Sequence, residues 1–340
     1  MRTIVFDSDI IEREVKPHSK LNIFRDMLEK EVREKLTAQE ILQLFGCPAC
    51  RADEGRRVFE KSKLTYLQCQ VCQSLYVNPR PTDQMIVEFY RHSHAWQFWR
   101  DHILPETREN RRNKIYYPQA RWLLDVCDEY RPEAECGVAV GYHSDMLIQE
   151  LYRLEPDLYP IIVTNPIANI EWIDIEIPGV TFLPSSTFDF QEITPIDILL
   201  AFDFLDRCAD IDAFFKNANR SLKPGGLLIA STILTGFDMW VLWDKSENIY
   251  PPDRLNLFSI EGLKILFQNH GFEILELSTP GMFDTESVNR AVRSNPEIEW
   301  PRFIRYLFEN RDESAFRELQ EFLQKFRLSS FGRIVLRKVD

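Results

Sequence analysis

From about residue 131 onward, short apolar segments alternate with amphipathic ones, and this alternation restricts the fold more than any other feature of the sequence. Apolar runs of about four to eight residues are typical of buried strands, whereas apolar residues at helical spacing indicate helices. The expected strands are EAECGVAV, YPIIVT, VTFLP, IDILLAF, LLIAST, FEILELS and GRIVLRKV. Strands that alternate with helices predict an α/β fold with a doubly wound, mostly parallel sheet.

Several helices can be placed between and before these strands. SIEGLKILFQNHG begins with Ser259, a suitable N-cap, and ends with Gly271, a suitable residue after the last helical turn. KPGG, at 223–226, is expected to form a turn. Further helices are expected over residues 20–45, 82–92, 107–129 and 312–326, and RTIVF near the start is strand-like.

Four of the seven cysteines form two CxxC pairs with eighteen residues between them: Cys47, Cys50, Cys69 and Cys72. This spacing is typical of a four-cysteine zinc site, because each CxxC turn presents two thiolates and two turns complete a tetrahedron. The intervening RVFEKS and LTYLQC are strand-like, as in a zinc ribbon. Four protein ligands leave no open coordination position, so the one Zn²⁺ expected per chain is structural.

Bulk properties exclude some classes of protein. The 340 residues, of which 44% are hydrophobic, can bury the core of one large domain with an appendage or of two domains. The sequence has no run of about 18 apolar residues and no basic-then-apolar signal pattern, so we expect a cytoplasmic protein without a membrane partner. A net charge of -12 disfavours nucleic acid as a partner, because such binding depends largely on neutralising phosphates.

AECGVAVGYHSDML, Ala134–Leu147, lies between an expected strand and an expected helix. Gly137 is expected to make a tight turn there, and Gly141 to let the next helix approach closely. Ala139 stands where a third glycine would bring the backbone nearest to a ligand. His143, in the same loop, is a candidate catalytic residue that would face a ligand cleft.

This glycine loop, LKPGG at Leu222–Gly226 and RLNLFSIEGLKILFQNHGFEI at Arg254–Ile274 resemble class I S-adenosylmethionine-dependent methyltransferases. The resemblance covers about residues 115–340. It implies a seven-stranded Rossmann-like sheet whose last strand is antiparallel and lies beside the fifth. It also implies S-adenosylmethionine as the cofactor.

A zinc module ahead of such a domain is similar to two groups of methyltransferases. One methylates carbon atoms of nucleotide-linked sugars, and the other methylates guanine in large-subunit ribosomal RNA. YVNPRPT and the TPG at 279–281 look more like the first group. The expected domains are an N-terminal helical extension (1–46), a zinc ribbon (47–81), a helical linker or cap (82–130) and the methyltransferase domain (131–340), with a helical insertion at 281–329.

The resemblance also implies which residues contact the cofactor: Glu135, Gly137, Ala139, Gly141, Asn165, Ser185, Ser186, Ala201, Phe202 and Asp203. Asn165 departs from the family pattern, because the second strand usually ends in a carboxylate that bonds the ribose hydroxyls. An amide can accept that bond but lacks the charge that strengthens it. Asp206-Arg207 stands where many members have Glu-His.

We therefore expect methyl transfer to a small-molecule biosynthetic intermediate, for which a nucleotide-linked sugar is the example that the resemblance favours. The candidate catalytic residues are His143, Tyr117 and Asp238, the last in a loop with Trp240, Trp243 and Tyr250 that could line an aromatic pocket. Two alternatives stay open. The departures from the motifs suit an inactive scaffold or binding subunit, and the zinc module suits an RNA methyltransferase.

Overall fold

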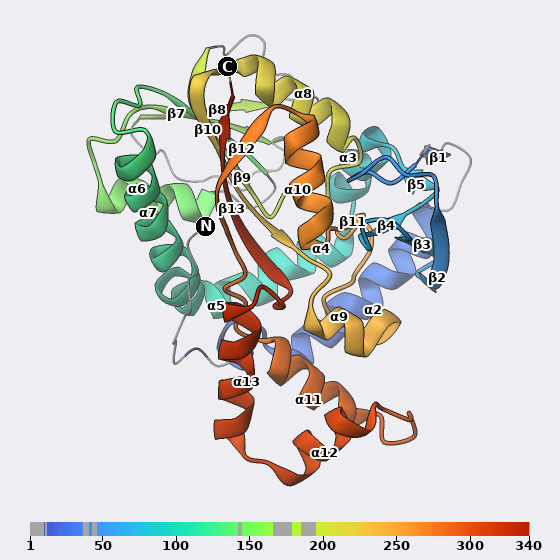
Figure 1. Ribbon diagram of the computed structural model, residues 1–340. Helices are drawn as coiled ribbons and strands as arrows, with labels where there is room; N and C mark the ends of the chain where they lie inside the picture. The colour runs from blue at the N-terminus through green and yellow to red at the C-terminus, as the bar shows by residue number, and fades with distance from the viewer. Residues whose placement is uncertain are drawn as a thin grey trace.

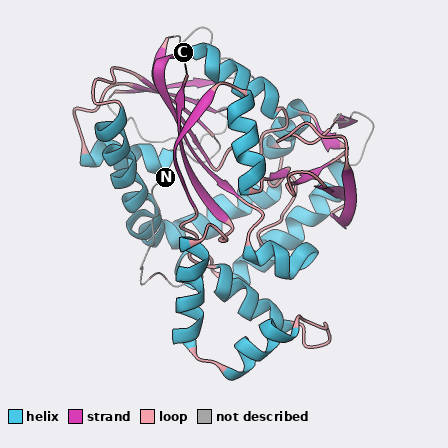
Figure 2. Ribbon diagram, in the orientation of Figure 1, coloured by secondary structure: helices cyan, strands magenta, loops and turns pink. Residues whose placement is uncertain are grey.

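The computed structural model describes residues 10, 12–36, 41–42, 46–141, 145–165, 179–184 and 195–339, and the structural statements below concern these residues. Their main body is a sheet of seven strands in the order β12-β13-β10-β9-β6-β7-β8, with helices on both faces (Figures 1 and 2). Among these residues, no helix has both the length and the apolar character needed to span a lipid bilayer.

The strands of this sheet confirm the expected mostly parallel arrangement. Their bounds are β6 Gly137–Val140, β7 Ile161–Asn165, β8 Val180–Pro184, β9 Ile196–Phe202, β10 Leu222–Ile233, β12 Phe272–Ser278 and β13 Phe331–Lys338. The first five run parallel to one another. The last strand, β13, lies antiparallel between β10 and β12, as the resemblance implies.

Two layers of helices bury the two faces of the sheet. On one face lie α6 (Tyr117–Tyr130) and α7 (Asp145–Leu154), and on the other lie α8 (Ile211–Ser221) and α10 (Ile260–Asn269). All seven residues of β9 are buried, because side chains on both faces of a central strand meet a helical layer.

Capping residues explain the bounds of α10. The Ser259 hydroxyl accepts a hydrogen bond of 2.8 Å from the backbone N–H of Gly262, and Gly271, with φ of +74°, follows the helix. Both capping predictions are confirmed. The expected KPGG turn is wrong as stated, because these residues lie inside β10, where the pairing with β9 shifts register between Leu222 and Leu227.

The helices of the N-terminal part are α1 Glu12–Val15, α2 His18–Lys35, α3 Asp83–Arg91, α4 His94–Phe98 and α5 Leu104–Arg111, with π-helical turns at Trp99–Ile103 (η1) and Arg112–Tyr116 (η2). Of these, α2, α4 and α5 lie along the edge of the sheet where the parallel strands end (Figure 1). The helix expected over 107–129 corresponds to α5, η2 and α6, which follow one another without a break. The strand-like RTIVF lies outside the described residues.

Between β12 and β13 the chain forms α11 (Asp284–Ser294), α12 (Arg302–Asn310) and α13 (Glu313–Lys325), which project from the body at the lower end of Figure 1. The short helix α9 (Phe237–Leu242) packs against α11, and Leu242 and Val288 share a small separate core.

A second sheet has the order β11-β4-β3-β2. Three of its strands come from the cysteine-rich segment: β2 Gly55–Lys61, β3 Leu64–Cys69 and β4 Leu75–Val77. The fourth, β11 (Asn256–Leu257), comes from the α/β part of the chain and pairs antiparallel with β4. A two-residue strand, β1 (Ile41–Leu42), pairs with β5 (Arg80–Pro81).

Candidate functional site

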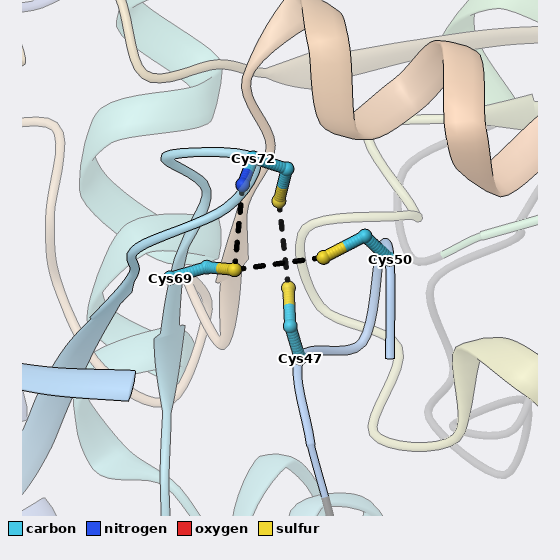
Figure 3. A group of neighbouring side chains, drawn as sticks. All are labelled: Cys47, Cys50, Cys69 and Cys72. Atoms are coloured by element: carbon cyan, nitrogen blue, oxygen red, sulfur yellow. Dashed lines mark hydrogen bonds between the residues drawn. The ribbon is translucent and has the colours of Figure 1, made fainter. Parts of the chain in front are cut away.

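The four cysteines of the two CxxC pairs converge on one point (Figure 3). All four Sγ atoms lie within 4.8 Å of one another, with 3.6 Å between Cys47 and Cys72 and 3.5 Å between Cys50 and Cys69. Zn–S bonds of about 2.3 Å in a tetrahedron place the sulfur atoms about 3.8 Å apart. The donor set and its spacing therefore fit one tetrahedral metal ion.

Similar backbone turns shape both halves of this cluster. Arg51 and Gln73 both adopt positive φ, and their N–H groups bond the carbonyls of Cys47 and Cys69 at 2.8 and 3.0 Å. The Cys72 Sγ lies 3.3 Å from the Ser74 hydroxyl. The contact between the Cys47 and Cys72 thiols is the main cause that lowers the pKa of Cys72, and the same contact raises the pKa of Cys47.

The cysteine cluster is joined to the α/β part of the chain. Ser259, the N-cap of α10, donates its hydroxyl to the carbonyl of Cys72, and its own N–H bonds the Ser74 hydroxyl at 3.0 Å. On β3, the Tyr66 hydroxyl donates to the carbonyl of Arg254 at 2.8 Å. The position of the turn at Cys72 and the start of α10 therefore depend on each other.

A cavity of about 630 Å³ lies at the carboxyl ends of the parallel strands. It is bordered by Asp203, which follows β9, by Ile233 at the end of β10, and by Met146 in the first turn of α7. This edge of an open α/β sheet is where ligands bind in such folds. Seven aromatic side chains line the cavity: Phe24, Trp96, Trp99, Tyr116, Tyr250, Phe283 and Phe331.

The cavity is also strongly basic, although the chain as a whole has a net charge of -12. Among the described residues, three acidic ones line it: Asp203, Glu247 and Asp284. Nine basic residues line it: Lys16, Arg25, Arg100, Arg108, Arg111, Lys114, Arg207, Arg254 and Arg333. The local balance of charge is therefore opposite in sign to that of the whole protein.

Two of these arginines belong to buried ion pairs beneath the cavity. Arg254 pairs with Asp206, and Arg207 pairs with Asp253 at 2.9 Å. Burial raises the pKa of Asp206, and the positive charges of Arg254 and Arg207 oppose that rise. The Asp206-Arg207 departure from the family motif thus fixes the loop that carries Asp253 and Arg254.

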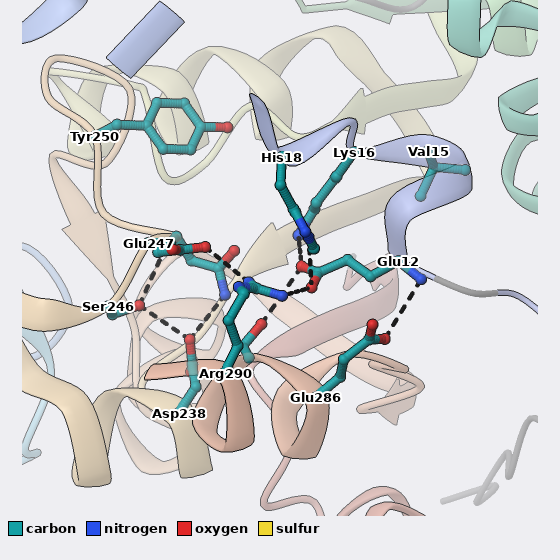
Figure 4. Close-up of polar contacts among 12 residues, drawn as sticks. Glu12, Val15, Lys16, His18, Asp238, Ser246, Glu247, Tyr250, Glu286 and Arg290 are labelled. Atoms are coloured by element: carbon teal, nitrogen blue, oxygen red, sulfur yellow. Dashed lines mark hydrogen bonds and ion pairs between the residues drawn. The ribbon is translucent and has the colours of Figure 1, made fainter. Parts of the chain in front are cut away.

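A cluster of charged residues holds α1 against the helical insertion (Figure 4). Glu12 is 1% exposed, and its carboxylate bonds both Lys16, at 3.1 Å, and Arg290 on α11. Arg290 also pairs with Glu247 at 2.7 Å. Since Lys16 and Glu247 line the cavity, we call Glu12, Lys16, Glu247 and Arg290 the α1 clasp.

We expect the α1 clasp to stabilise the protein in a pH-dependent way. Burial opposes ionisation of Glu12, but Lys16 and Arg290 outweigh it and lower the pKa of Glu12 to about 2 from its usual 4.5. A lowered carboxyl pKa contributes stability that is complete above pH 4.5 and is lost as the pH falls toward 2. The contribution is at most about 3 kcal/mol.

Urea denaturation at several pH values tests this expectation with Glu12→Gln and the exposed control Glu297→Gln. The difference in unfolding free energy between the unchanged protein and Glu12→Gln should be largest above pH 5 and should shrink toward pH 2. The control should show no such trend. A difference that stays constant with pH would contradict the assigned pKa.

The structure corrects the expected glycine loop. Gly137 does not make a turn: it begins β6, and Ala139 lies buried inside that strand, paired with Leu200. Glu135 precedes the strand at the edge opposite the cavity, where its exposed carboxylate lies 3.6 Å from Lys223. These three residues are therefore displaced from a ligand at the carboxyl edge.

Other expected cofactor contacts do lie at the carboxyl edge. Gly141 follows β6 with φ of +141°, so the loop begins at this glycine. Asn165 ends β7, and Asp203 follows Phe202 at the end of β9 and lines the cavity. Ala201 is buried within β9, whereas Ser185 and Ser186, like the side chain of Asn165, lie outside the described residues.

The structure places none of the three candidate catalytic residues at the cavity, and the reason differs from one to the next. His143 lies outside the described residues. Tyr117 is 37% exposed and does not line the cavity, whereas the preceding Tyr116 does. Asp238 is fully buried, and its oxygens accept hydrogen bonds from Ser330, from Ser246 at 3.1 Å and from Asn248 at 2.8 Å.

Asp238 therefore anchors its loop and is not positioned to act on a ligand. Of the aromatic residues expected to form a pocket with it, Tyr250 lines the cavity, while Trp240 is 47% exposed and Trp243 packs against Phe59.

Sequence reasoning missed the basic wall of the cavity. Arg108 and Arg111, on α5, and Lys114, on η2, lie in the stretch TRENRRNKIYY, whose excess of positive charge was the available signal. Its meaning depends on the tertiary fold, because the facing residues come from α2 and from the loops after β10 and β12.

Comparison with known proteins identifies the α/β part of the chain. The model of a family described as a methyltransferase domain matches residues 85–277. A sequence search of curated proteins finds no match.

Similar solved structures include phosphoethanolamine N-methyltransferase 2 from Haemonchus contortus, with 14% identity, a TM-score of 0.46, and coverage of 78% of this chain and 62% of that one. A SAM-dependent methyltransferase from Archaeoglobus fulgidus has 12% identity, a TM-score of 0.41, and coverage of 65% and 94%. The cyclopropane synthase MmaA2 from Mycobacterium tuberculosis has 14% identity, a TM-score of 0.37, and coverage of 60% and 78%.

The family assignment depends on the sequence match and not on these distant structural likenesses. Because that match extends over more than half of the chain, the protein belongs to the methyltransferase domain family.

Proposed function

We propose that this protein transfers a methyl group from S-adenosylmethionine to a small molecule bound in the basic cavity. The observation that carries the proposal is the position of the cavity in a methyltransferase domain, at the carboxyl ends of β9 and β10. Its volume of about 630 Å³ is in the range of small-molecule sites. The net charge of -12 also favours a small acceptor over RNA.

S-adenosylmethionine, when bound, supplies a methyl group that is activated by the positive sulfur. The residues of this chain would then bind the acceptor, align its nucleophilic atom with the methyl group and exclude water. Asp203 lines the cavity, and Gly141 follows β6 at the same edge of the sheet; we assign these two residues to cofactor binding. The aromatic side chains of the opposite wall, among them Trp99 and Tyr250, would pack against the acceptor.

We also propose that the four-cysteine cluster holds one structural Zn²⁺. The convergence of the four Sγ atoms within 4.8 Å supports this, as does the burial of three of the four cysteines, Cys50 being partly exposed. The cluster adds no open coordination position and takes no part in methyl transfer.

Titration with S-adenosylmethionine in a calorimeter tests the proposed function. Gly141→Val should weaken binding at least about tenfold, because a side chain is strained at φ of +141° and its Cβ would lie 3.1 Å from the carbonyl oxygen of Phe202. Gly225→Val is the matched control. Gly225 also has a positive φ, of +70°, but lies in the β10 bulge at the opposite edge.

The control should bind S-adenosylmethionine as the unchanged protein does. If the unchanged protein binds no S-adenosylmethionine at millimolar concentration, the alternative of a scaffold or binding subunit replaces the proposed function. If Gly141→Val binds normally, the cofactor does not use this loop.

A further inference from the structure

The charge of the cavity is only partly balanced by the protein. Six of its basic residues have an acidic partner: Lys16 with Glu12, Arg25 with Glu247, Arg100 with Asp101, Lys114 with Glu14, Arg207 with Asp253, and Arg254 with Asp206. Of the other three, Arg333 is buried, with its guanidinium 4.9 Å from the centre of the Trp122 ring. Arg108 and Arg111 belong to no ion pair among the residues that the structure describes. Positive charges that line a partly enclosed cavity are best balanced by a bound anion.

Arg108 and Arg111 face the cavity from the same helix. They are three residues apart on α5, so they lie on the same side of the helix, and both line the cavity. Arg108 is exposed at the cavity wall and makes no hydrogen bond among the described side chains. Its guanidinium is free to turn toward a ligand.

Arg111, by contrast, is already held in place. Its guanidinium lies 5.1 Å from the centre of the Trp99 ring, its Nε donates to the Thr107 hydroxyl at 3.0 Å, and its Nη2 donates to the carbonyl of Val15 at 2.7 Å. Its Nη1 takes part in neither bond. A guanidinium that is held in place before binding loses little conformational entropy when it donates hydrogen bonds to an anion.

We propose that the methyl acceptor carries a phosphate or carboxylate group, and that this group binds to Arg108 and Arg111. The inference extends the proposed function, because it specifies the chemical class of the acceptor. Guanidinium groups bond both kinds of anion through paired N–H donors. The rest of the acceptor would extend from α5 past Trp99 toward Asp203, where the methyl group is transferred.

Calorimetric titrations with inorganic phosphate, pyrophosphate and malonate test the anion site without cofactor. The double variant Arg108→Gln/Arg111→Gln should weaken the tightest of these interactions about tenfold or more, since it removes two charge-assisted contacts. Arg302→Gln/Arg305→Gln is the matched control, because these exposed arginines have the same spacing on α12. It removes the same charge and should change binding less than about twofold.

Two further measurements make the result specific. Arg108→Gln alone, which breaks no side-chain hydrogen bond or ion pair of the described residues, should by itself weaken anion binding. All variants should bind S-adenosylhomocysteine as the unchanged protein does, because the anion site is distinct from the cofactor site. Tighter binding of phosphate or pyrophosphate than of malonate identifies a phosphorylated acceptor, and the reverse order identifies a carboxylate.

The inference is overturned if no anion binds in an arginine-dependent way, if the control pair weakens binding equally, or if S-adenosylhomocysteine affinity falls together with anion affinity. That last result would assign the arginines to the cofactor. Failure of the proposed function is a separate outcome: the protein would bind anions through Arg108 and Arg111 but would not bind S-adenosylmethionine.

Discussion

Replacing Cys69 by serine is expected to remove the bound metal and to destabilise α10 together with the cysteine-rich segment. The free energy of metal binding is also folding free energy for such a cluster, and it amounts to roughly 10 kcal/mol or more in zinc peptides. The effect should reach α10 because its N-cap, Ser259, bonds the backbone of Cys72. Metal analysis should give one zinc per chain for the unchanged protein and none for the variant.

Hydrogen exchange measures how far the damage extends. Amides of residues 260–269 should lose protection in Cys69→Ser, whereas the control Cys136→Ser, outside the cluster, should keep both its metal and its protection. Metal-free protein from a fresh, reduced preparation would refute the zinc site. Loss of metal with unchanged protection of α10 would refute the coupling.

Breaking the buried pair of Asp206 and Arg254 is expected to cost about 3–5 kcal/mol of unfolding free energy. Both side chains are almost fully buried, with 0% and 8% of their surface exposed. Arg254→Met leaves the Asp206 carboxylate without its partner in a site that water does not reach, and it also removes the 3.0 Å bond to the Tyr250 hydroxyl.

Urea denaturation measures this cost. The double variant Asp206→Leu/Arg254→Met should lose less stability than Arg254→Met alone, because it leaves no uncompensated charge. Arg57→Met breaks the exposed pair with Glu60 and should cost less than about 1 kcal/mol. If Arg254→Met costs no more than this control, the buried pair does not stabilise the loop.

Local patterns in the sequence were sufficient for much of the fold. The strands could be placed because their apolar runs are continuous, as in β9. The ends of α10 could be predicted because the backbone conformation at each end of a helix favours particular residue types, here serine and glycine. The spacing of the cysteines within each CxxC pair likewise predicts a local turn. Each of these features depends on residues that are close together in the chain.

The glycine loop could not be predicted correctly because the end of a strand depends on its neighbours in the sheet. β6 extends from Gly137 to Val140 since β7 and β9 pair with it over that whole length. Gly137 is small for a packing reason: a Cβ there would lie 3.1 Å from the ring of Tyr159. A glycine selected by packing and one selected by a turn look identical in the sequence.

The cavity was beyond sequence reasoning for a related reason. Arg111 stacks on Trp99 and bonds Val15, so its orientation is set by segments that reach it only in the folded chain. The basic character of its helix could be read from the sequence, but the cavity that this helix faces could not.

β11, the edge strand of the small sheet, belongs to the α/β part of the chain, and this has a consequence for synthesis on the ribosome. β2, β3 and β4 emerge early, whereas β11 emerges only after most of the α/β sheet has been made. Since the ribosome adds about 5–20 residues per second, the edge of β4 stays unpaired for on the order of ten seconds or more. During that interval a bound metal would add to the pairing of β2, β3 and β4 in holding this segment together, so zinc supply would influence the yield of folded protein.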